Sequence, residues 1–419
     1  MLTLALILCA ALVASLVLQA IPTLGFARVL RRGGRTPLTD AQCPKAAVIL
    51  CLRGEDPFLG RCLESLFRQS YPDFTIFVVV DSMLDPAYET VCESIAAHGP
   101  DNVVVDVLTN RLDTCSLKGS SIVQAMSRID ESYKIVAMID SDVIPHPTWL
   151  RELAAPLLDD AVGVSSGTRW YMPSRPTWGS FVRYYWNAAA NVQMYWNEIT
   201  WGGSVALRGE IARHPEMIRS WKTAVSTDTV ILRVVHLFQK RAEFVPSLMM
   251  INRETCRLSS FYTWVQRQMV VVRLYHKGWV PIVTHGMLVV ALLAACFGVV
   301  FTALGYGETR TAGILFGVMM GYWVGFVALF HALEEQVRAV VVARGEPVET
   351  PTFESVVMAF LSVFITPWVY AAVLIKACFI RHVDWRGIGY ELNGPHDVRL
   401  VSYRPYVKAD RPRDVTASI

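Results

Sequence analysis

Four long apolar segments constrain this chain more than any other feature of its sequence. They are residues 2–20, 279–304, 312–333 and 355–380. A helix of about 20 apolar residues spans the hydrocarbon core of a bilayer. Only 18% of the 419 residues are charged, whereas soluble domains carry about 25%. The sequence therefore predicts an integral membrane protein, with an N-terminal transmembrane helix in residues 1–26 and about three more helices in residues 277–380.

Basic residues follow the first apolar segment: Arg28, Arg31, Arg32 and Arg35. A cleaved signal peptide carries its basic residues ahead of the apolar stretch, and cytoplasmic loops are rich in Lys and Arg. The pattern predicts an uncleaved anchor that leaves the next part of the chain in the cytoplasm. Four crossings would place the basic C-terminal tail, residues 381–419, outside, against the same rule. The sequence leaves the side of the tail open.

Between the apolar segments, residues 44–276 alternate short apolar runs with amphipathic stretches. The pattern predicts strands at residues 46–52, 74–80, 103–108 and 135–139, and helices at residues 58–70, 86–98 and 117–127. Strands that alternate with helices form a mostly parallel, Rossmann-like α/β sheet. Such sheets bind ligands at the carboxyl ends of their strands. Neither a GxGxxG run nor a P-loop occurs, so the usual dinucleotide and P-loop sites are excluded.

Aspartates stand at two of these strand ends. Asp81 follows the second strand, and Asp140-Ser141-Asp142 follows the fourth. Residues two apart on an extended chain face the same side, so Asp140 and Asp142 can share one ion. Hard divalent cations prefer carboxylate oxygens. A plain turn is the alternative interpretation of the Asp-Ser-Asp sequence.

The composition gives no support for a nucleic-acid or zinc ligand. A net charge of +3 gives no reason to expect a nucleic-acid partner. The nine cysteines are scattered without a CxxC pair, so the sequence suggests neither a disulfide framework nor a zinc site.

These motifs, in this order, resemble the inverting family 2 glycosyltransferases, and among them most of all the ceramide glucosyltransferase group. The resemblance rests on Asp81, Lys118 in CSLKGSS, Asp140-Ser141-Asp142, Ser226-Thr227-Asp228 and Arg267. The stretches VILCLRGEDPFLGRCLESLFRQSYPDF and VDWRGIGYEL are also similar to that group. The resemblance implies a cytosolic GT-A domain, residues 44–276, between one N-terminal membrane helix and several C-terminal ones.

The resemblance also implies roles on the donor side. Asp81 would contact the nucleotide base, and Lys118 a phosphate or the uracil, although a surface lysine at a helix start is an equal alternative. Asp142 would coordinate Mg²⁺ or Mn²⁺, with Asp140 close to the ribose or the metal. Arg267 would stabilise the departing diphosphate with its permanent charge and forked donors. An interfacial helix that places Arg267 on lipid phosphate is the rival interpretation.

On the acceptor side, inversion needs a base that deprotonates the attacking hydroxyl, and Asp228 is the candidate. A helix N-cap is the alternative role for Asp228. The family's acceptor loop corresponds to Trp201-Gly202-Gly203-Ser204, which follows an aromatic-rich stretch that begins at Trp178. Gln268 stands where the family has a tryptophan, and Trp264, one helical turn earlier, could cover the same surface.

The expected activity is the transfer of one hexose from a UDP-sugar to the hydroxyl of a membrane lipid. UDP-glucose and ceramide follow from the resemblance alone, and diacylglycerol is equally compatible with the residues. A processive polysaccharide synthase and a non-catalytic membrane protein with a decayed domain are the alternatives. The presence of every expected aspartate favours an enzyme, and the small number of helices favours a single transfer over a polymer channel.

Overall fold

The computed structural model describes residues 1–348 and 350–406. Its soluble domain is built on a seven-stranded sheet with the strand order β3-β2-β1-β4-β6-β5-β7. The strands are β1 (Ala46–Leu52), β2 (Phe74–Val80), β3 (Val103–Val107), β4 (Ile135–Ile139), β5 (Val162–Tyr171), β6 (Ser204–Arg208) and β7 (Arg241–Asn252). Strand β6 pairs antiparallel with β4 and β5, and the other pairs are parallel. The predicted, mostly parallel α/β sheet is confirmed.

Strands β1 to β4 occur where the apolar runs predict them. Nearly all residues of β1, β2 and β4 are buried on both faces of the sheet, whereas those of the edge strand β3 are half-buried. The helices between them are α2 (Leu59–Phe67), α3 (Pro86–His98) and α4 (Leu117–Met126). Asp85 caps α3 through the backbone N–H of Ala87, and Ser116 caps α4 through that of Gly119. These caps determine where the loops after β2 and β3 end and where α3 and α4 begin. Helix α5 (Trp149–Ala154) follows β4.

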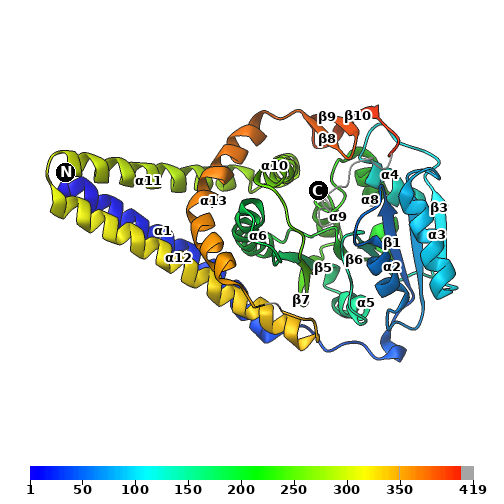
Figure 1. Cartoon of the computed structure of the whole chain (residues 1–419). Coiled ribbons are helices and arrows are strands. Elements are labelled where there is room, and N and C mark those ends of the chain that lie inside the picture. The colour runs from blue at the N-terminus through cyan, green and yellow to red at the C-terminus, as the bar shows by residue number, and fades with distance from the viewer. Residues whose placement is uncertain (349, 407–419) are drawn as a thin grey trace.

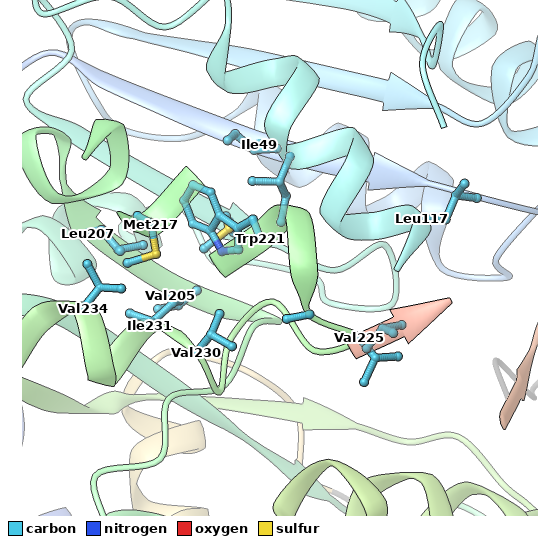
Figure 2. Packing of buried hydrophobic residues seen from close by; sticks show 14 of the residues in the cluster. Ile49, Leu117, Val205, Leu207, Met217, Trp221, Val225, Val230, Ile231 and Val234 are labelled. Atoms are coloured by element: carbon cyan, nitrogen blue, oxygen red, sulfur yellow. The ribbon is translucent and has the colours of Figure 1, made fainter. Parts of the chain in front are cut away.

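The helices after β6 form a core that holds one loop of the site in place. They are α7 (Gly209–Arg213), α8 (Pro215–Thr223) and α9 (Ile231–Leu237). Trp221 of α8 is fully buried, and its indole Nε1 donates to the carbonyl of Thr227 at 3.0 Å. Val225 and Val230, which precede and follow Thr227 in the sequence, are buried in the same cluster as Trp221 (Figure 2). The short segment between these two valines, which contains Asp228, is therefore anchored at both ends.

Four helices among the described residues are long and apolar enough to cross a membrane: α1 (Leu2–Arg32), α11 (Trp279–Gly305), α12 (Thr309–Ala343) and α13 (Phe353–Phe379). Helix α1 packs along α12. Helices α11 and α12 diverge from their short connection, and α13 runs between their far ends (Figure 1). From the soluble domain, α6 (Trp178–Trp196) and α10 (Leu258–Tyr275) pack against α13.

The C-terminal end of α12, which leads into α13, and the C-terminal end of α13 are both attached to the soluble domain. Arg344, just after α12, donates to the carbonyls of Ser247 and Met249 in β7, each at 2.8 Å. At the other end, Arg273 of α10 donates to the carbonyls of Ala377, Cys378 and Ile380. Helix α13 therefore follows the face of the soluble domain, whereas α1, α11 and α12 extend away from it (Figure 1).

After α13 the chain forms a small antiparallel sheet that the sequence analysis did not predict. Its strands are β8 (His382–Trp385), β9 (Ile388–Gly394) and β10 (Asp397–Tyr403). The Tyr390 hydroxyl accepts the backbone N–H of Leu117 at 3.0 Å, and the N–H of Leu400 donates to the Asp113 carbonyl at 2.7 Å. Residues 382–403 thus lie on the same side as the soluble domain. The end of the predicted basic tail, residues 407–419, lies outside the described residues.

Candidate active site

One cavity of about 830 Å³ joins the carboxyl ends of the strands to the membrane helices. Asp140, Asp142 and Asp228 line it within the soluble domain. Side chains of α1, α6, α10, α11, α12 and α13 continue its wall toward the membrane segments. The C-terminal sheet adds Trp385, Arg386 and Tyr390. Eight of the twelve predicted site residues therefore line one cavity, and Asp81, Gly202, Gly203 and Ser204 are not among its lining residues.

The aspartate pair is held by two cations. Lys118 Nζ contacts Asp140 Oδ1, and Arg169 Nη2 of β5 lies 2.5 Å from Asp142 Oδ1 and 3.9 Å from Asp140 Oδ2. Burial tends to raise the pKa of Asp140, but Lys118 and Arg169 hold it below its ordinary value. For Asp142, burial raises the pKa against the opposing charge of Arg169. Lys118 is thus a partner of the aspartates and not a plain surface lysine.

The aspartate pair fits a divalent metal by its donor chemistry. No group of three or more His, Cys, Asp or Glu side chains that could hold a metal ion is found in the described part of the chain. Mg²⁺ nevertheless often binds through one or two carboxylates and takes its other ligands from water and substrate phosphates. Asp140 and Asp142 supply those two carboxylates, and both line the cavity. They are the residues that would hold the Mg²⁺ or Mn²⁺ expected from the sequence.

Asp81 lies apart from the cavity wall. Its side chain is 1% exposed, and its carboxylate pairs with Arg53 and with Arg111 Nε at 3.2 Å. The Tyr403 hydroxyl of β10 donates to Asp81 Oδ2 at 3.0 Å. These donors occupy the acceptor oxygens that the sequence analysis assigned to a nucleotide base. In the structure Asp81 belongs to an ion-pair network, of which Arg53, but not Asp81, lines the cavity.

Asp228 faces the cavity in a fixed orientation. Its Oδ2 accepts the N–H of Gly202 at 2.8 Å, and its Oδ1 accepts the Ser226 hydroxyl at 2.5 Å and the N–H of Thr229 at 2.8 Å. A Cβ atom at position 202 would lie 3.0 Å from Asp228 Oδ2, so the glycine permits this close approach. Helix α9 begins at Ile231 with Val230 as its N-cap residue and no side-chain cap. Asp228 is therefore not the helix cap.

Arg267 lies in the cavity beside the C-terminal sheet. Its guanidinium carbon is 4.9 Å from the centroid of the Trp385 ring. Burial, and then the neighbouring charge of Arg386, lower the pKa of Arg267 to about 10. Like charges repel, so an anion bound beside these two guanidinium groups, which both line the cavity, would be favoured. The place of Arg267 in the cavity wall argues against its interpretation as a surface anchor.

The predicted acceptor residues divide into two groups. Trp201, Trp264 and Gln268 line the cavity, and the Trp264 ring packs edge-to-face 5.4 Å from that of Trp186. The rest of the glycine loop serves the soluble domain: Gly202 holds Asp228, and the Trp201 ring covers Gly203. Ser204 is fully buried, and its hydroxyl accepts Trp149 Nε1 at 2.8 Å, away from the cavity.

Sequence reasoning missed four residues of the cavity: Arg169, Glu254, Trp385 and Arg386. Glu254 forms a fully buried ion pair with Arg183 at 3.0 Å, and burial raises the pKa of Glu254 to about 7. The VDWRGIGYEL stretch, which is similar to the ceramide glucosyltransferase group, contains Trp385 and Arg386 and is the signal that could have identified them. Arg169 and Glu254 follow from no motif, because only the fold brings them beside the aspartates.

The comparisons with known proteins agree with this architecture. Residues 44–211 match the family model described as glycosyltransferase like family 2. No curated protein matches the chain. Among solved structures, the mannosyltransferase PcManGT from Pyrobaculum calidifontis, in complex with GDP-Man and Mn²⁺, aligns with a TM-score of 0.50 at 16% identity, over 90% of this chain and 97% of that one.

Glucosyl-3-phosphoglycerate synthase from M. tuberculosis aligns with a TM-score of 0.38 at 13% identity, over 57% of this chain and 86% of that one. The family match shows that residues 44–211 are similar to family 2 glycosyltransferases, and the first alignment shows a GT-A-like fold. The ceramide glucosyltransferase group predicted from the sequence stays a hypothesis.

Proposed function

We propose that the protein is an inverting glycosyltransferase that moves one hexose from a UDP-sugar, with UDP-glucose as the first candidate, to the hydroxyl of a membrane lipid such as ceramide or diacylglycerol. The observation that carries the proposal is the single cavity, which holds the three aspartates at one end and side chains of α1, α11, α12 and α13 at the other. A soluble acceptor would not need a site walled by membrane helices.

The donor half is suited to a diphosphate. Asp140 and Asp142 would hold Mg²⁺ or Mn²⁺, which supplies positive charge to the leaving group when bound. Arg267 and Arg386 face the same space and would bind the phosphate oxygens through their forked donors. Lys118, beside Asp140, adds a further positive charge. Asp81 would contribute to the base only indirectly, by holding Arg53 in the cavity wall.

The acceptor half is suited to a lipid hydroxyl next to a base. Asp228 takes the proton as the hydroxyl oxygen forms its bond to the anomeric carbon, and the bond from that carbon to the diphosphate breaks on the opposite face. The backbone N–H of Gly202 fixes the orientation of the Asp228 carboxylate. Trp201, Trp264 and Gln268 would surround the polar head of the lipid, and the apolar walls of α11 and α13 its chains.

A reconstitution experiment tests this function. The full chain in lipid nanodiscs that contain ceramide or diacylglycerol is incubated with a panel of UDP-sugars and Mn²⁺. Release of UDP together with a lipid whose mass increases by one hexose is expected, and chelation should abolish both. Polymer instead of glycolipid would favour a processive synthase. UDP formation without a lipid product, or no turnover with any donor, would contradict the proposal.

The attachment of α13 supports a cytoplasmic soluble domain with three crossings. If α1, α11 and α12 cross and α13 lies at the interface, residues 381–406 are on the same side as the soluble domain, as their contacts require. The basic residues at and just after the C-terminal end of α1, and those in the C-terminal segment, then share the cytoplasmic side. This arrangement removes the conflict that four crossings create.

Labelling with a membrane-impermeant maleimide tests the arrangement. Cysteines are introduced at the exposed positions Asp101, Gly307 and Ser402 after the exposed Cys92 and Cys378 are replaced by serine. The first and third sites should react only in inverted vesicles, and the site in the α11–α12 connection only in intact cells. Opposite accessibility of positions 101 and 402 would show that α13 crosses.

A further inference from the structure

Arg169 occupies the position that a metal ion on the aspartate pair would need. Its Nη2 lies 2.5 Å from Asp142 Oδ1 and 3.9 Å from Asp140 Oδ2, so one guanidinium nitrogen is close to an oxygen of each carboxylate. A divalent ion bound by the two carboxylates must lie within about 2.0–2.6 Å of their oxygens. The guanidinium and such an ion therefore compete for the same oxygens.

The fold holds the Arg169 cation at this place. The side-chain amides of Asn187 and Asn191 donate to the Arg169 carbonyl at 3.2 and 2.9 Å, which fixes its backbone. Its guanidinium carbon lies 4.8 Å from the centroid of the Trp201 ring, where the aromatic face attracts the positive charge. The side chain is only 14% exposed. Water is therefore a poor alternative partner, and Arg169 keeps its charge next to Asp142.

The charges in this cluster balance without a metal. Lys118 and Arg169 carry two positive charges, and Asp140 and Asp142 carry two negative ones. A divalent ion added to the free enzyme brings two uncompensated positive charges within a few ångströms of both cations. The diphosphate of a donor brings the missing negative charge. Its oxygens are also acceptors that a guanidinium binds as well as it binds a carboxylate.

We propose that Arg169 is a positioning residue that makes metal binding depend on the donor diphosphate. In the free enzyme it neutralises Asp142 and competes with the divalent ion, and the bound diphosphate removes this competition by accepting the guanidinium. The inference rests on the proposed use of a metal with a nucleotide sugar. By linkage, the factor by which UDP tightens metal binding equals the factor by which the metal tightens UDP binding.

Titration of the full chain in detergent with Mn²⁺, followed by the electron paramagnetic resonance signal of the free ion, tests the proposal without turnover. The wild type should bind Mn²⁺ weakly alone and more tightly with UDP. Arg169→Met and Arg169→Gln should bind Mn²⁺ alone roughly tenfold more tightly or better, since a charge this close typically shifts a carboxylate pKa by one unit or more. In both variants the tightening caused by UDP should shrink by a similar factor.

Three further variants complete the test. Arg169→Lys retains the positive charge, so its side chain should still compete with Mn²⁺ for the carboxylate oxygens, and Mn²⁺ should bind nearly as weakly as in the wild type. Arg128→Met removes a positive charge from the exposed ion pair with Asp106 and should leave Mn²⁺ affinity unchanged. Asp142→Asn combined with Arg169→Met should lose the added affinity, which assigns it to the aspartate pair. Thermal melting of each variant confirms that it is folded.

The outcomes separate this inference from the proposed function. If the wild type binds Mn²⁺ with UDP but Arg169→Met and Arg169→Gln bind Mn²⁺ alone no more tightly, the competition is absent and Arg169 only braces Asp142. If the folded wild type binds no Mn²⁺ even with UDP, the metal in the proposed function is wrong, and this inference falls with it.

Discussion

The two ends of the cavity are built from different kinds of side chain. At the end proposed to bind the donor, charges lie in short ion pairs, such as those of Lys118 with Asp140 and Arg169 with Asp142. At the end proposed to bind the acceptor, aromatic rings meet at centroid distances of 5.4–5.9 Å, as Trp264 does with Trp186 and Tyr171. Charge interactions in a poorly hydrated space are strong and depend on position, whereas aromatic packing tolerates small shifts. Substitutions should therefore change the rate at the first end and the preference for acceptors at the second.

Asp228 stands between the two ends and gives the largest expected effect. Asp228→Asn retains the size of the side chain and one acceptor oxygen but cannot take the acceptor proton. We expect kcat to fall by about 10²–10⁴-fold, with UDP affinity unchanged within a few fold. Steady-state kinetics on one lipid at saturating donor measure the first quantity, and titration with UDP the second. Normal turnover in a folded variant would leave Asp228 as a loop residue only.

Arg267 probes the donor end. Arg267→Ala removes a guanidinium that faces the cavity beside Arg386, so the charge of a departing diphosphate loses one partner. By analogy with the removal of one donor to a transition-state oxyanion, kcat should fall by about 10²–10³-fold. Arg267→Lys should recover part of the loss, because it restores charge without the fork.

The matched control for this variant is Arg257→Ala, at the exposed N-terminus of the same helix α10. It should retain full activity. If Arg267→Ala is as active as Arg257→Ala at saturating UDP-sugar, Arg267 has no part in the transfer, and the charged character of this end would not explain the rate.

The buried side chain of Glu254, which also lines the cavity, should make the stability of the protein depend on pH. Burial raises the pKa of Glu254 to about 7, whereas an unfolded glutamate has a pKa of about 4.3. Between these values the folded state binds the extra proton, so the free energy of unfolding falls as the pH rises from about 4.5 to 7 and then levels off.

The expected change is on the order of 1–3 kcal/mol. Glu254→Gln cannot titrate and should flatten this part of the thermal-melting profile, at the cost of leaving Arg183 without its buried counter-charge. Glu216→Gln, on α8 in the soluble domain, serves as the control for the loss of one glutamate. If stability changes with pH by the same amount in Glu254→Gln and in the wild type, Glu254 stays ionised beside Arg183.

The two halves of the site also differ in how much the sequence could predict. Strands β1 to β4 follow from continuous apolar runs, and the loops after β2 and β4 begin with aspartates that the pattern identifies. Arg169 lies in β5, and Glu254 follows β7. These two strands are neighbours in the sheet but are separated in the sequence by a long segment that includes α6 and β6, so sequence reasoning missed both residues. Their role depends on which strands become neighbours, and local periodicity does not contain that information.

The role of the C-terminal sheet was missed for a similar reason. Apolar and polar residues alternate only weakly in its short strands, and the basic composition of this segment favours an unstructured tail. Tyr403 nevertheless donates a hydrogen bond to Asp81, 322 positions earlier in the sequence. Tyr403 is thus one of the partners that surround Asp81, which was predicted as a base contact and is not among the residues that line the cavity. A residue at a strand end can be identified from the sequence, but the partners that cover it cannot.

The smallest expected effect belongs to Gln268, at the acceptor end. Gln268 lines the cavity one helical turn after Trp264, whose ring already covers part of this surface. Gln268→Ala removes an amide that can bind the lipid head but no charge, so kcat for the best lipid should change less than about fivefold. The ratio of kcat/KM for ceramide to that for diacylglycerol should change more, up to about tenfold, the range of one hydrogen bond to an uncharged group.

Trp264→Ala is the companion variant and should raise KM for both lipids, because the ring would contact any acceptor that enters this end of the cavity. If Gln268→Ala instead lowers kcat equally for both lipids, this end of the cavity takes part in the chemistry, and the division between a rate-setting end and a selective end is wrong.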